Sequence, residues 1–180
     1  MSRLPTMDRE SLSPEDQTIW DGIAANRRGG VRGPYAALMH VPKLAHQVAA
    51  LQDYFTENAR LPAADRELVV LATAREMGAH FAWARHEERG IEVGTRFEAI
   101  DAVRAAGGLD ALTAHERLLV ELAHALLRTR ALPRTLYDRA LAELGQTQLI
   151  ETVTLVGYYS LIGVVINGFE VPPPEGVPTF

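Results

Sequence analysis

Apolar residues recur at intervals of three and four positions along most of the 180-residue chain, which is the spacing of one face of an α-helix. Prolines at positions 14, 34, 42 and 62 stand where helices begin, and glycines follow several of the apolar segments. No segment alternates with a period of two, and no hairpin signal separates two apolar segments. The sequence therefore predicts an all-α fold of about eight helices.

Capping signals mark three of the expected helix starts. Ser13 precedes a proline and two acidic residues, which is the composition of a helix N-terminus. Thr95 is followed three residues later by Glu98, and Thr113 by Glu116. In a capping box with this spacing, the two residues exchange hydrogen bonds between side chain and backbone. We therefore expect helices to begin directly after Thr95 and Thr113.

The chain also contains an internal repeat. Segments that start at Leu61 and Leu112 align at an offset of 51 residues, and a match of this length predicts two related helical units. The matched pairs are Leu61 and Leu112, Arg66 and Arg117, Leu68 and Leu119, Val69 and Val120, Leu71 and Leu122, Ala72 and Ala123, and Ala74 and Ala125. We expect a helical extension over residues 1–29, the repeat-containing domain over 30–171 and a proline-rich tail over 172–180.

Positions that match across the repeat share a structural role, whereas positions that differ in chemistry are candidates for function. Glu67 is the clearest case, because a carboxylate at a site where the other unit has a leucine needs a partner or a purpose. The chemically unlike pairs are Glu67 and Leu118, His86 and Tyr137, and Trp83 and Arg134.

Helical spacing groups the unusual residues of the first unit. Residues three and four apart lie on one helix face, and the face around His86 consists of Ala79, Ala82, Trp83, His86 and Gly90. If a short turn at Gly78 makes this helix and the preceding one antiparallel neighbours, His86 meets Glu67, and the pair can relay a proton. The alternatives are a hydrogen-bonded histidine on a half-buried face, a glutamate ion-paired to Arg66 or Arg75, and a core tryptophan. One histidine and one glutamate are too few ligands to predict a metal site.

Composition excludes several classes of protein. The net charge is −5 and the chain has no cysteine, so disulfides and thiol catalysis are excluded and nucleic-acid binding is not expected. The apolar segment 153–166 is interrupted by polar residues, which favours a core helix over a membrane span. The glycine-rich segment with Arg27, Arg28 and Arg32 is expected to be a solvated loop, with an anion-holding loop as the alternative. Without an apolar leader segment, a soluble cytoplasmic protein is the expectation.

The segment RELVVLATAREMGAHFAWARHEERGIEVG resembles the carboxymuconolactone decarboxylase-like superfamily, which includes the AhpD-like peroxidases. Glu67 and His86 match the glutamate and histidine of the family pattern, whereas Ala79 and Ala82 stand where the CxxC cysteines would be. GPYAALMHVPKLAHQVAAL and GYYSLIGVVINGFEVPPPEG resemble the family's N-terminal and closing regions, so the resemblance covers about residues 30–175. The chain is most similar to the cysteine-free branch.

This resemblance implies an AhpD-like helical domain over residues 30–171 and a homo-oligomer: a dimer, trimer or hexamer. Without the cysteine pair, peroxidase activity is excluded. The implied function is a lyase or isomerase that acts on a small organic acid or lactone without a cofactor, with His86 as general acid or base and Glu67 orienting it. The candidate substrate-binding residues are Trp83, Ala79, Ala82, Tyr158, Tyr159 and Asn167. The alternative is a non-catalytic small-ligand-binding or assembly protein on the same fold.

Overall fold

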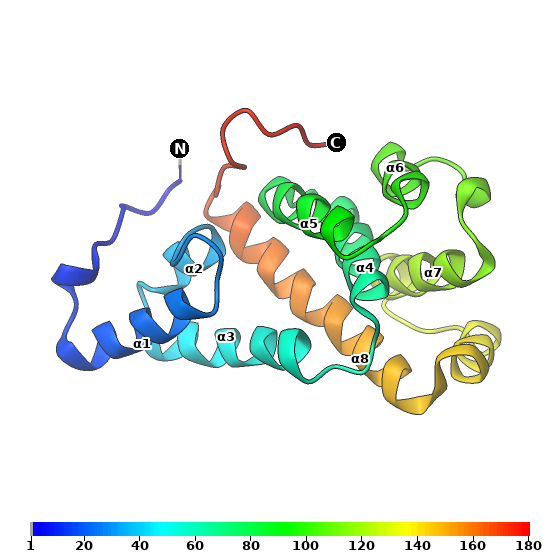
Figure 1. Ribbon diagram of the computed structural model, residues 1–180, viewed down its shortest axis with the longest axis horizontal. Helices are drawn as coiled ribbons and strands as arrows, with labels where there is room; N and C mark the ends of the chain where they lie inside the picture. The colour runs from blue at the N-terminus through cyan, green and yellow to red at the C-terminus, as the bar shows by residue number, and fades with distance from the viewer. Residues whose placement is uncertain (1) are drawn as a thin grey trace. The chain divides into compact units, whose positions relative to one another are not determined.

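The computed structural model describes residues 2–180 and shows an all-α fold, with no β-strand among these residues (Figure 1). The α-helices are α1 Pro14–Ala25, α2 Pro34–Leu38, α3 Pro42–Glu57, α4 Ala63–Glu76, α5 His80–Glu92, α6 Phe97–Ala105, α7 Ala114–Thr129 and α8 Arg134–Gly168. Two 3₁₀ turns, Arg9–Ser11 and Leu109–Ala111, accompany them. The predicted fold class is thereby confirmed.

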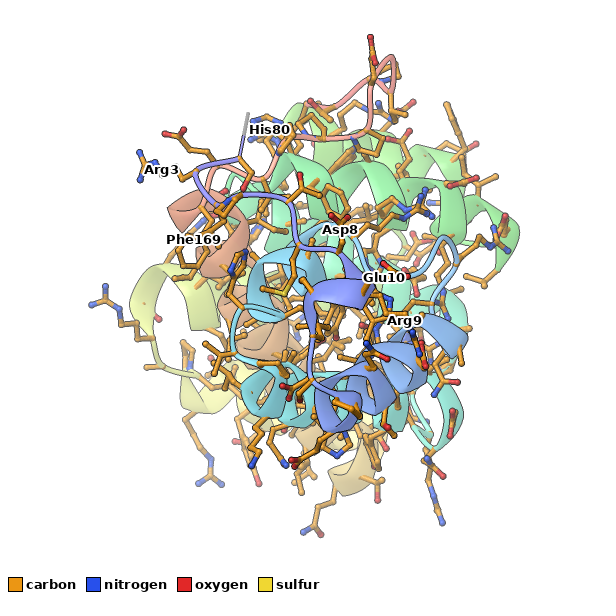
Figure 2. All side chains as sticks on the ribbon, turned by 90° about the vertical axis from the view of Figure 1, so that its left-hand side faces the viewer. Arg3, Asp8, Arg9, Glu10, His80 and Phe169 are labelled. Carbon is orange, nitrogen blue, oxygen red and sulfur yellow. The ribbon has the colours of Figure 1, made fainter. Side chains whose placement is uncertain are left out.

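The chain divides into two compact units, one of residues 2–58 with 165–172 and the other of residues 59–164 with 173–180. The first unit contains α1, α2 and α3, and α1 packs on α3. Ser13 caps α1 as predicted, accepting a hydrogen bond from the backbone N–H of Asp16. At the other end of the same unit, Arg3 lies beside Phe169 and donates its backbone N–H to the Phe169 carbonyl (Figure 2).

Arg28 and Arg32 are exposed in the predicted solvated loop, but Arg27 is not. Its side chain is only 8% exposed and pairs with Asp53 at 3.1 Å. Its guanidinium also lies over the Tyr35 ring at 4.2 Å and donates to the carbonyls of Ile23 and Ala49. A guanidinium has five N–H donors and is costly to bury unpaired, so this arginine ties α1 to α3 instead of holding an external anion.

In the second unit α4 is the central helix, and it contacts α5, α6 and α7. Its residues 66–74 are all buried, because neighbouring helices cover more than one of its faces. Gly90 of α5 lies in this packing: a Cβ there would be 3.4 Å from Thr95 Oγ1 and 3.6 Å from Leu71 and Ile100, which is ordinary van der Waals contact. The capping box at Thr113 and Glu116 is confirmed.

The capping box predicted at Thr95 is wrong. Arg96 is the N-cap of α6 and makes no side-chain capping bond. The Thr95 hydroxyl instead donates to the Ala64 carbonyl at 3.1 Å, close to the start of α4. Thr95 is buried, and a buried hydroxyl bonds whichever carbonyl the packing brings to it. Here that carbonyl belongs to another helix.

The long helix α8 is interrupted at Gly145, whose φ of 70° and ψ of 171° are not helical. Glycine adopts this left-handed φ without the steric cost that a Cβ would add. Beyond the kink, the buried Glu151 accepts backbone N–H bonds from Arg60 and Leu61, at distances between 2.8 and 3.1 Å. This carboxylate fixes the chain where it enters α4.

By length and composition, α8 could also cross a membrane. However, 56% of its most apolar window is buried inside the fold, and a core helix of a globular protein has the same composition. The buried side of α8 carries Leu155, Tyr158, Tyr159 and Ile162. The prediction of a core helix therefore agrees with the packing of these side chains.

Candidate functional site

The predicted meeting of Glu67 and His86 occurs in the structure. Helix α5 follows α4 after a turn at Gly78, whose φ of 63° lies in the left-handed region that favours glycine. The turn brings the two helices into contact. His86 Nδ1 then lies 2.6 Å from Glu67 Oε2, slightly shorter than the about 2.7–2.9 Å that is usual for a charge-assisted N–H···O hydrogen bond.

Tyr159 of α8 completes a group of three residues that we call the relay: Glu67, His86 and Tyr159. The Tyr159 hydroxyl lies 3.1 Å from His86 Nε2, so both nitrogens of the imidazole are bonded. The two rings meet edge to face, with centroids 4.9 Å apart. The relay is largely enclosed, since Glu67 and Tyr159 are 2% and 8% exposed and the His86 side chain is 14% exposed.

Glu67 is ionised although it is buried. Burial acts to raise its pKa, but the charge and hydrogen bond of His86 and the charges of Arg89 and Arg66 outweigh burial, so the pKa of Glu67 lies below its ordinary value. Arg89 Nε and Arg66 Nε lie 3.2 and 3.9 Å from Glu67 Oε1. The carboxylate is therefore held between an imidazole on one oxygen and two guanidinium groups on the other.

The ionised Glu67 fixes the tautomer of His86. A carboxylate can only accept hydrogen bonds, so Nδ1 of His86 carries a proton in both charge states of the ring. In the neutral ring Nε2 then accepts from the Tyr159 hydroxyl, and in the protonated ring Nε2 donates to it. His86 can thus take up or release one proton at Nε2, next to a phenol that can pass it on.

Trp83 lies on α5, the helix that also carries His86, and it is fully buried among polar partners. Its Nε1 donates to Glu87 Oε2 at 2.7 Å, and Arg104 binds the other oxygen of the same carboxylate. The ring of Phe180 packs edge-on against Trp83, with centroids 5.3 Å apart. The role of Trp83 in the wall of a substrate pocket stays a prediction, because Phe180 of the C-terminal tail packs against the indole ring.

His80, the first residue of α5, is half-buried. Its ring stacks on Phe180 at 4.3 Å, and Nδ1 lies 3.0 Å from the Thr179 hydroxyl. Figure 2 shows His80 close to this C-terminal segment. The guanidinium of Arg75 also lies over the Phe180 ring, 4.4 Å from the ring centroid. The tail thus contacts α4 and α5 through Thr179 and Phe180.

The remaining predicted residues lie in three settings. Ala79 is the N-cap residue of α5, and Ala82 lies in its first turn; they are 1% and 5% exposed. Tyr158 is buried and contacts the Tyr159 ring edge-on at 5.0 Å. Asn167 is exposed and belongs to the other compact unit. Their roles in substrate binding stay predictions.

Arg89 and Glu87 are the residues that sequence reasoning missed. Arg89 follows His86 by three positions, so the spacing that grouped the relay face could have included it. Glu87 stands four residues after Trp83, which is the spacing for a side-chain pair on one helix face. Neither side chain is small or aromatic, and these two properties marked the helix face around His86 in the sequence.

A second histidine cluster lies away from the relay. His115 is bonded on both ring nitrogens, to Asp65 at 2.9 Å and Glu143 at 3.2 Å. Burial acts to lower its pKa, but the hydrogen bonds and charges of Asp65 and Glu143 outweigh burial and raise it. The group is half-exposed and ties α7 to α4 and α8. Among residues 2–180, no three His, Asp or Glu side chains are arranged to hold a metal ion.

No protein-family model matches the sequence, and no curated protein resembles it significantly. A solved structure does match: the alkylhydroperoxidase AhpD core of an uncharacterized peroxidase-related protein from Ralstonia eutropha JMP134. The match has a TM-score of 0.80 and covers 97% of this chain and 93% of the other, at 18% identity. At this identity the match establishes the fold, and the chain therefore has the AhpD-like all-α fold, built here without cysteine.

Proposed function

We propose that this protein is a cofactor-independent lyase or isomerase of the carboxymuconolactone decarboxylase-like type. Its substrate is a small organic acid or lactone. The observation that carries the proposal is the imidazole of His86, bonded on one side to an ionised carboxylate and on the other to a phenol. The carboxylate holds Nδ1, so proton exchange takes place at Nε2, through or beside the Tyr159 hydroxyl. This is the arrangement of a general acid–base histidine.

The chemistry needs only proton transfer and positive charge. In a decarboxylation, the electron pair of the breaking C–C bond moves into a carbonyl of the substrate, and CO₂ leaves. The electron pair then returns to carbon, which takes a proton from His86 or Tyr159 to form a new C–H bond in place of the broken C–C bond, and solvent returns a proton to the relay. In an isomerisation the same residues remove a proton from one carbon and return it to another. Arg89, with 37% of its side chain exposed, supplies positive charge beside the relay for an acidic substrate.

Thiol peroxidase chemistry is no part of this proposal. The solved structure that shares the fold is described as peroxidase-related, but this chain has no cysteine, and reduction of a peroxide by a protein thiol needs a thiolate. The fold is shared without the nucleophile.

One observation favours the alternative, a non-catalytic binding or assembly protein. The relay residues are between 2% and 14% exposed, so a substrate reaches Nε2 only if Tyr159 moves aside. If the relay is merely structural, its function is to hold α4, α5 and α8 together through one hydrogen-bonded group.

Two measurements separate these functions. Small lactones and keto acids are incubated with the protein and followed by mass spectrometry, and the same compounds are incubated in D₂O to detect exchange of carbon-bound hydrogen. We expect turnover or exchange with the natural chain, a fall of about 10²–10⁴-fold in His86→Ala, and a smaller fall in Tyr159→Phe. Equal rates with His86→Ala would show that the relay is structural.

A further inference from the structure

The ring of Phe180 lies among three side chains of the same compact unit. His80 stacks on this ring, with centroids 4.3 Å apart, and Trp83 meets it edge to face at 5.3 Å. The guanidinium of Arg75 lies 4.4 Å from the ring centroid. We call these three residues, Arg75, His80 and Trp83, the Phe180 site. Stacking, an edge contact and a cation over the face all depend on the π system of the ring, so the site is selective for aromatic groups.

Two residues of the site are fixed by contacts that do not involve the tail. Nε1 of Trp83 donates to Glu87 at 2.7 Å, and the guanidinium of Arg104 lies over the indole ring, 5.6 Å from its centroid. Arg75 Nε donates to the Arg104 carbonyl at 2.9 Å. Because these contacts join α4, α5 and α6, Trp83 and Arg75 stay in place to hold another ring when Phe180 leaves.

The charge of Arg75 is available to an anion beside this ring. Within residues 2–180, its guanidinium donates to the Arg104 carbonyl and forms no ion pair with a carboxylate. The carboxylate of the adjacent Glu76 is bound by Arg128 instead. A guanidinium has five N–H donors and binds a carboxylate through two of them. The terminal nitrogens of Arg75 therefore suit an anionic group attached to an aromatic ring.

The tail that carries Phe180 has few polar contacts. Its residues 175–178 are exposed. In the described part of the chain, no backbone hydrogen bond joins residues 173–180 to another segment, and Val177 donates to the Pro174 carbonyl within the tail. The Thr179 hydroxyl lies 3.0 Å from Nδ1 of His80. A segment held by so few contacts opens at a low cost in free energy, so Phe180 can exchange with a free ligand.

We propose that the Phe180 site binds a small aromatic carboxylate, and that Phe180 occupies the site when this ligand is absent. The ring of the ligand replaces the Phe180 ring, and its carboxylate pairs with the terminal nitrogens of Arg75. Among the described residues, no hydrogen bond, ion pair or ring contact joins the site to the relay. The proposal therefore does not depend on the proposed enzymatic function.

Calorimetric titration with sodium benzoate tests the site, because benzoate combines the ring and the anionic group in one small molecule. The natural chain is compared with Phe180→Ala, which vacates the site. A tail that occupies the site for about 90% of the time raises the apparent Kd about tenfold. We therefore expect Phe180→Ala to bind benzoate about tenfold more tightly than the natural chain. Circular dichroism should show that this variant remains folded, because Phe180 is only half-buried.

Control ligands and variants in the Phe180→Ala background separate ring from charge. Cyclohexanecarboxylate keeps the charge without the π system and should bind about three- to tenfold more weakly than benzoate. Arg75→Gln should weaken benzoate binding at least about tenfold and change the binding of the neutral benzamide much less. Arg85→Gln is the matched control, since Arg85 lies on α5 and pairs with Glu88 at 3.5 Å; it should bind benzoate as before. His86→Ala should also bind benzoate unchanged.

The fluorescence of Trp83 locates the ligand. The chain has two tryptophans, and Trp20 lies on α1 of the other compact unit. Trp20→Phe therefore leaves Trp83 as the single indole reporter. In the chain that also carries Phe180→Ala, benzoate should change the Trp83 emission and saturate at the Kd found by calorimetry.

Several results would overturn the proposal. Benzoate that binds the natural chain and Phe180→Ala equally lies outside the Phe180 site, and benzoate that does not bind Phe180→Ala at about 10 mM has no site there. Equal binding of cyclohexanecarboxylate shows an anion site without aromatic selectivity. Loss of binding in His86→Ala places the ligand at the relay. A Phe180→Ala chain that unfolds shows that the ring is a structural anchor and no ligand site.

Discussion

Two helix pairs of this protein share a sequence pattern and differ in chemistry. Glu67 of α4 and Leu118 of α7 occupy matching positions and are equally buried, at 2% and 3% exposure. Around Glu67 stand His86, Arg89 and Arg66, whereas Leu118 is itself an aliphatic residue of the buried core. The fold can thus fill this site with a plain aliphatic side chain, and the first pair uses a costly carboxylate with three partners instead.

A second pair of matching positions shows the same difference. Trp83 and Glu87 of α5 are joined by a 2.7 Å hydrogen bond, and Trp83 is 0% exposed. Arg134 and Asp138 of α8 stand at the matching positions and form an ion pair at 2.9 Å, with the Arg134 side chain 84% exposed. Equal spacing therefore gives a buried polar contact in one pair and a surface ion pair in the other. The internal repeat itself stays a prediction from the sequence.

The largest expected effect is a loss of activity on replacing His86, whose matching residue in the other helix pair is Tyr137. His86→Phe should lower turnover of an identified substrate by about 10²–10⁴-fold, the usual loss for a positioned acid–base group. The variant should remain folded, because the matching position already carries the aromatic Tyr137. Tyr137→Phe is the matched control and should keep full activity in the same steady-state assay. A His86→Phe variant that unfolds would instead mark the residue as structural.

The next largest effect is expected on the free energy of unfolding, when the side chains at the matching buried positions 67 and 118 are exchanged. Leu118→Glu should lower it by about 3–5 kcal/mol. Tyr137 and Ala140 stand at the positions that match His86 and Arg89, so the new carboxylate lacks these two partners of Glu67. Glu67→Leu should lower the free energy of unfolding by about 1–3 kcal/mol, since it leaves Arg66 and Arg89 without their acceptor. Urea unfolding followed by circular dichroism measures both.

The double exchange sharpens this test. Glu67→Leu combined with Leu118→Glu should be no more stable than the sum of the single changes predicts, because Ala140 stands at the position that matches Arg89. A double variant that regains the natural stability would show that both sites offer equivalent surroundings to a carboxylate.

A smaller difference is expected at Trp83 and Arg134. Trp83→Phe removes the indole donor from a buried contact and should cost about 1–2 kcal/mol of unfolding free energy. Arg134→Ala removes an exposed ion pair and should cost less than about 0.5 kcal/mol. The same urea titration compares them, and equal losses would contradict the different burial of the two pairs.

The pH dependence of stability should also separate the matching positions. The pKa of Glu67 is lower in the folded protein than in the unfolded chain, so as the pH falls the unfolded chain binds the proton first. The stabilisation by Glu67 is therefore present above about pH 4.3 and is lost as the pH falls through the folded pKa. The stability difference between the natural chain and Glu67→Gln should shrink from pH 7 to pH 3, whereas the loss in Leu118→Ala should stay constant.

The sequence by itself determined the helices and one of the two contacts of the relay, the contact between Glu67 and His86. Prolines and glycines placed most element boundaries within a few residues, and the period of apolar residues predicted the all-α class. The meeting of Glu67 with His86 also followed from the sequence, because a glycine turn between two helices leaves few ways to arrange their facing sides.

Only the tertiary structure decided which distant groups complete these sites. Tyr159 reaches His86 from 73 positions away, Thr95 bonds Ala64 instead of capping its own helix, and Arg27 is buried against Asp53. Helical periodicity fixes which residues share a face, but it does not fix which other helix covers that face. A buried polar group then bonds the partner that packing supplies, and that partner is a property of the fold as a whole.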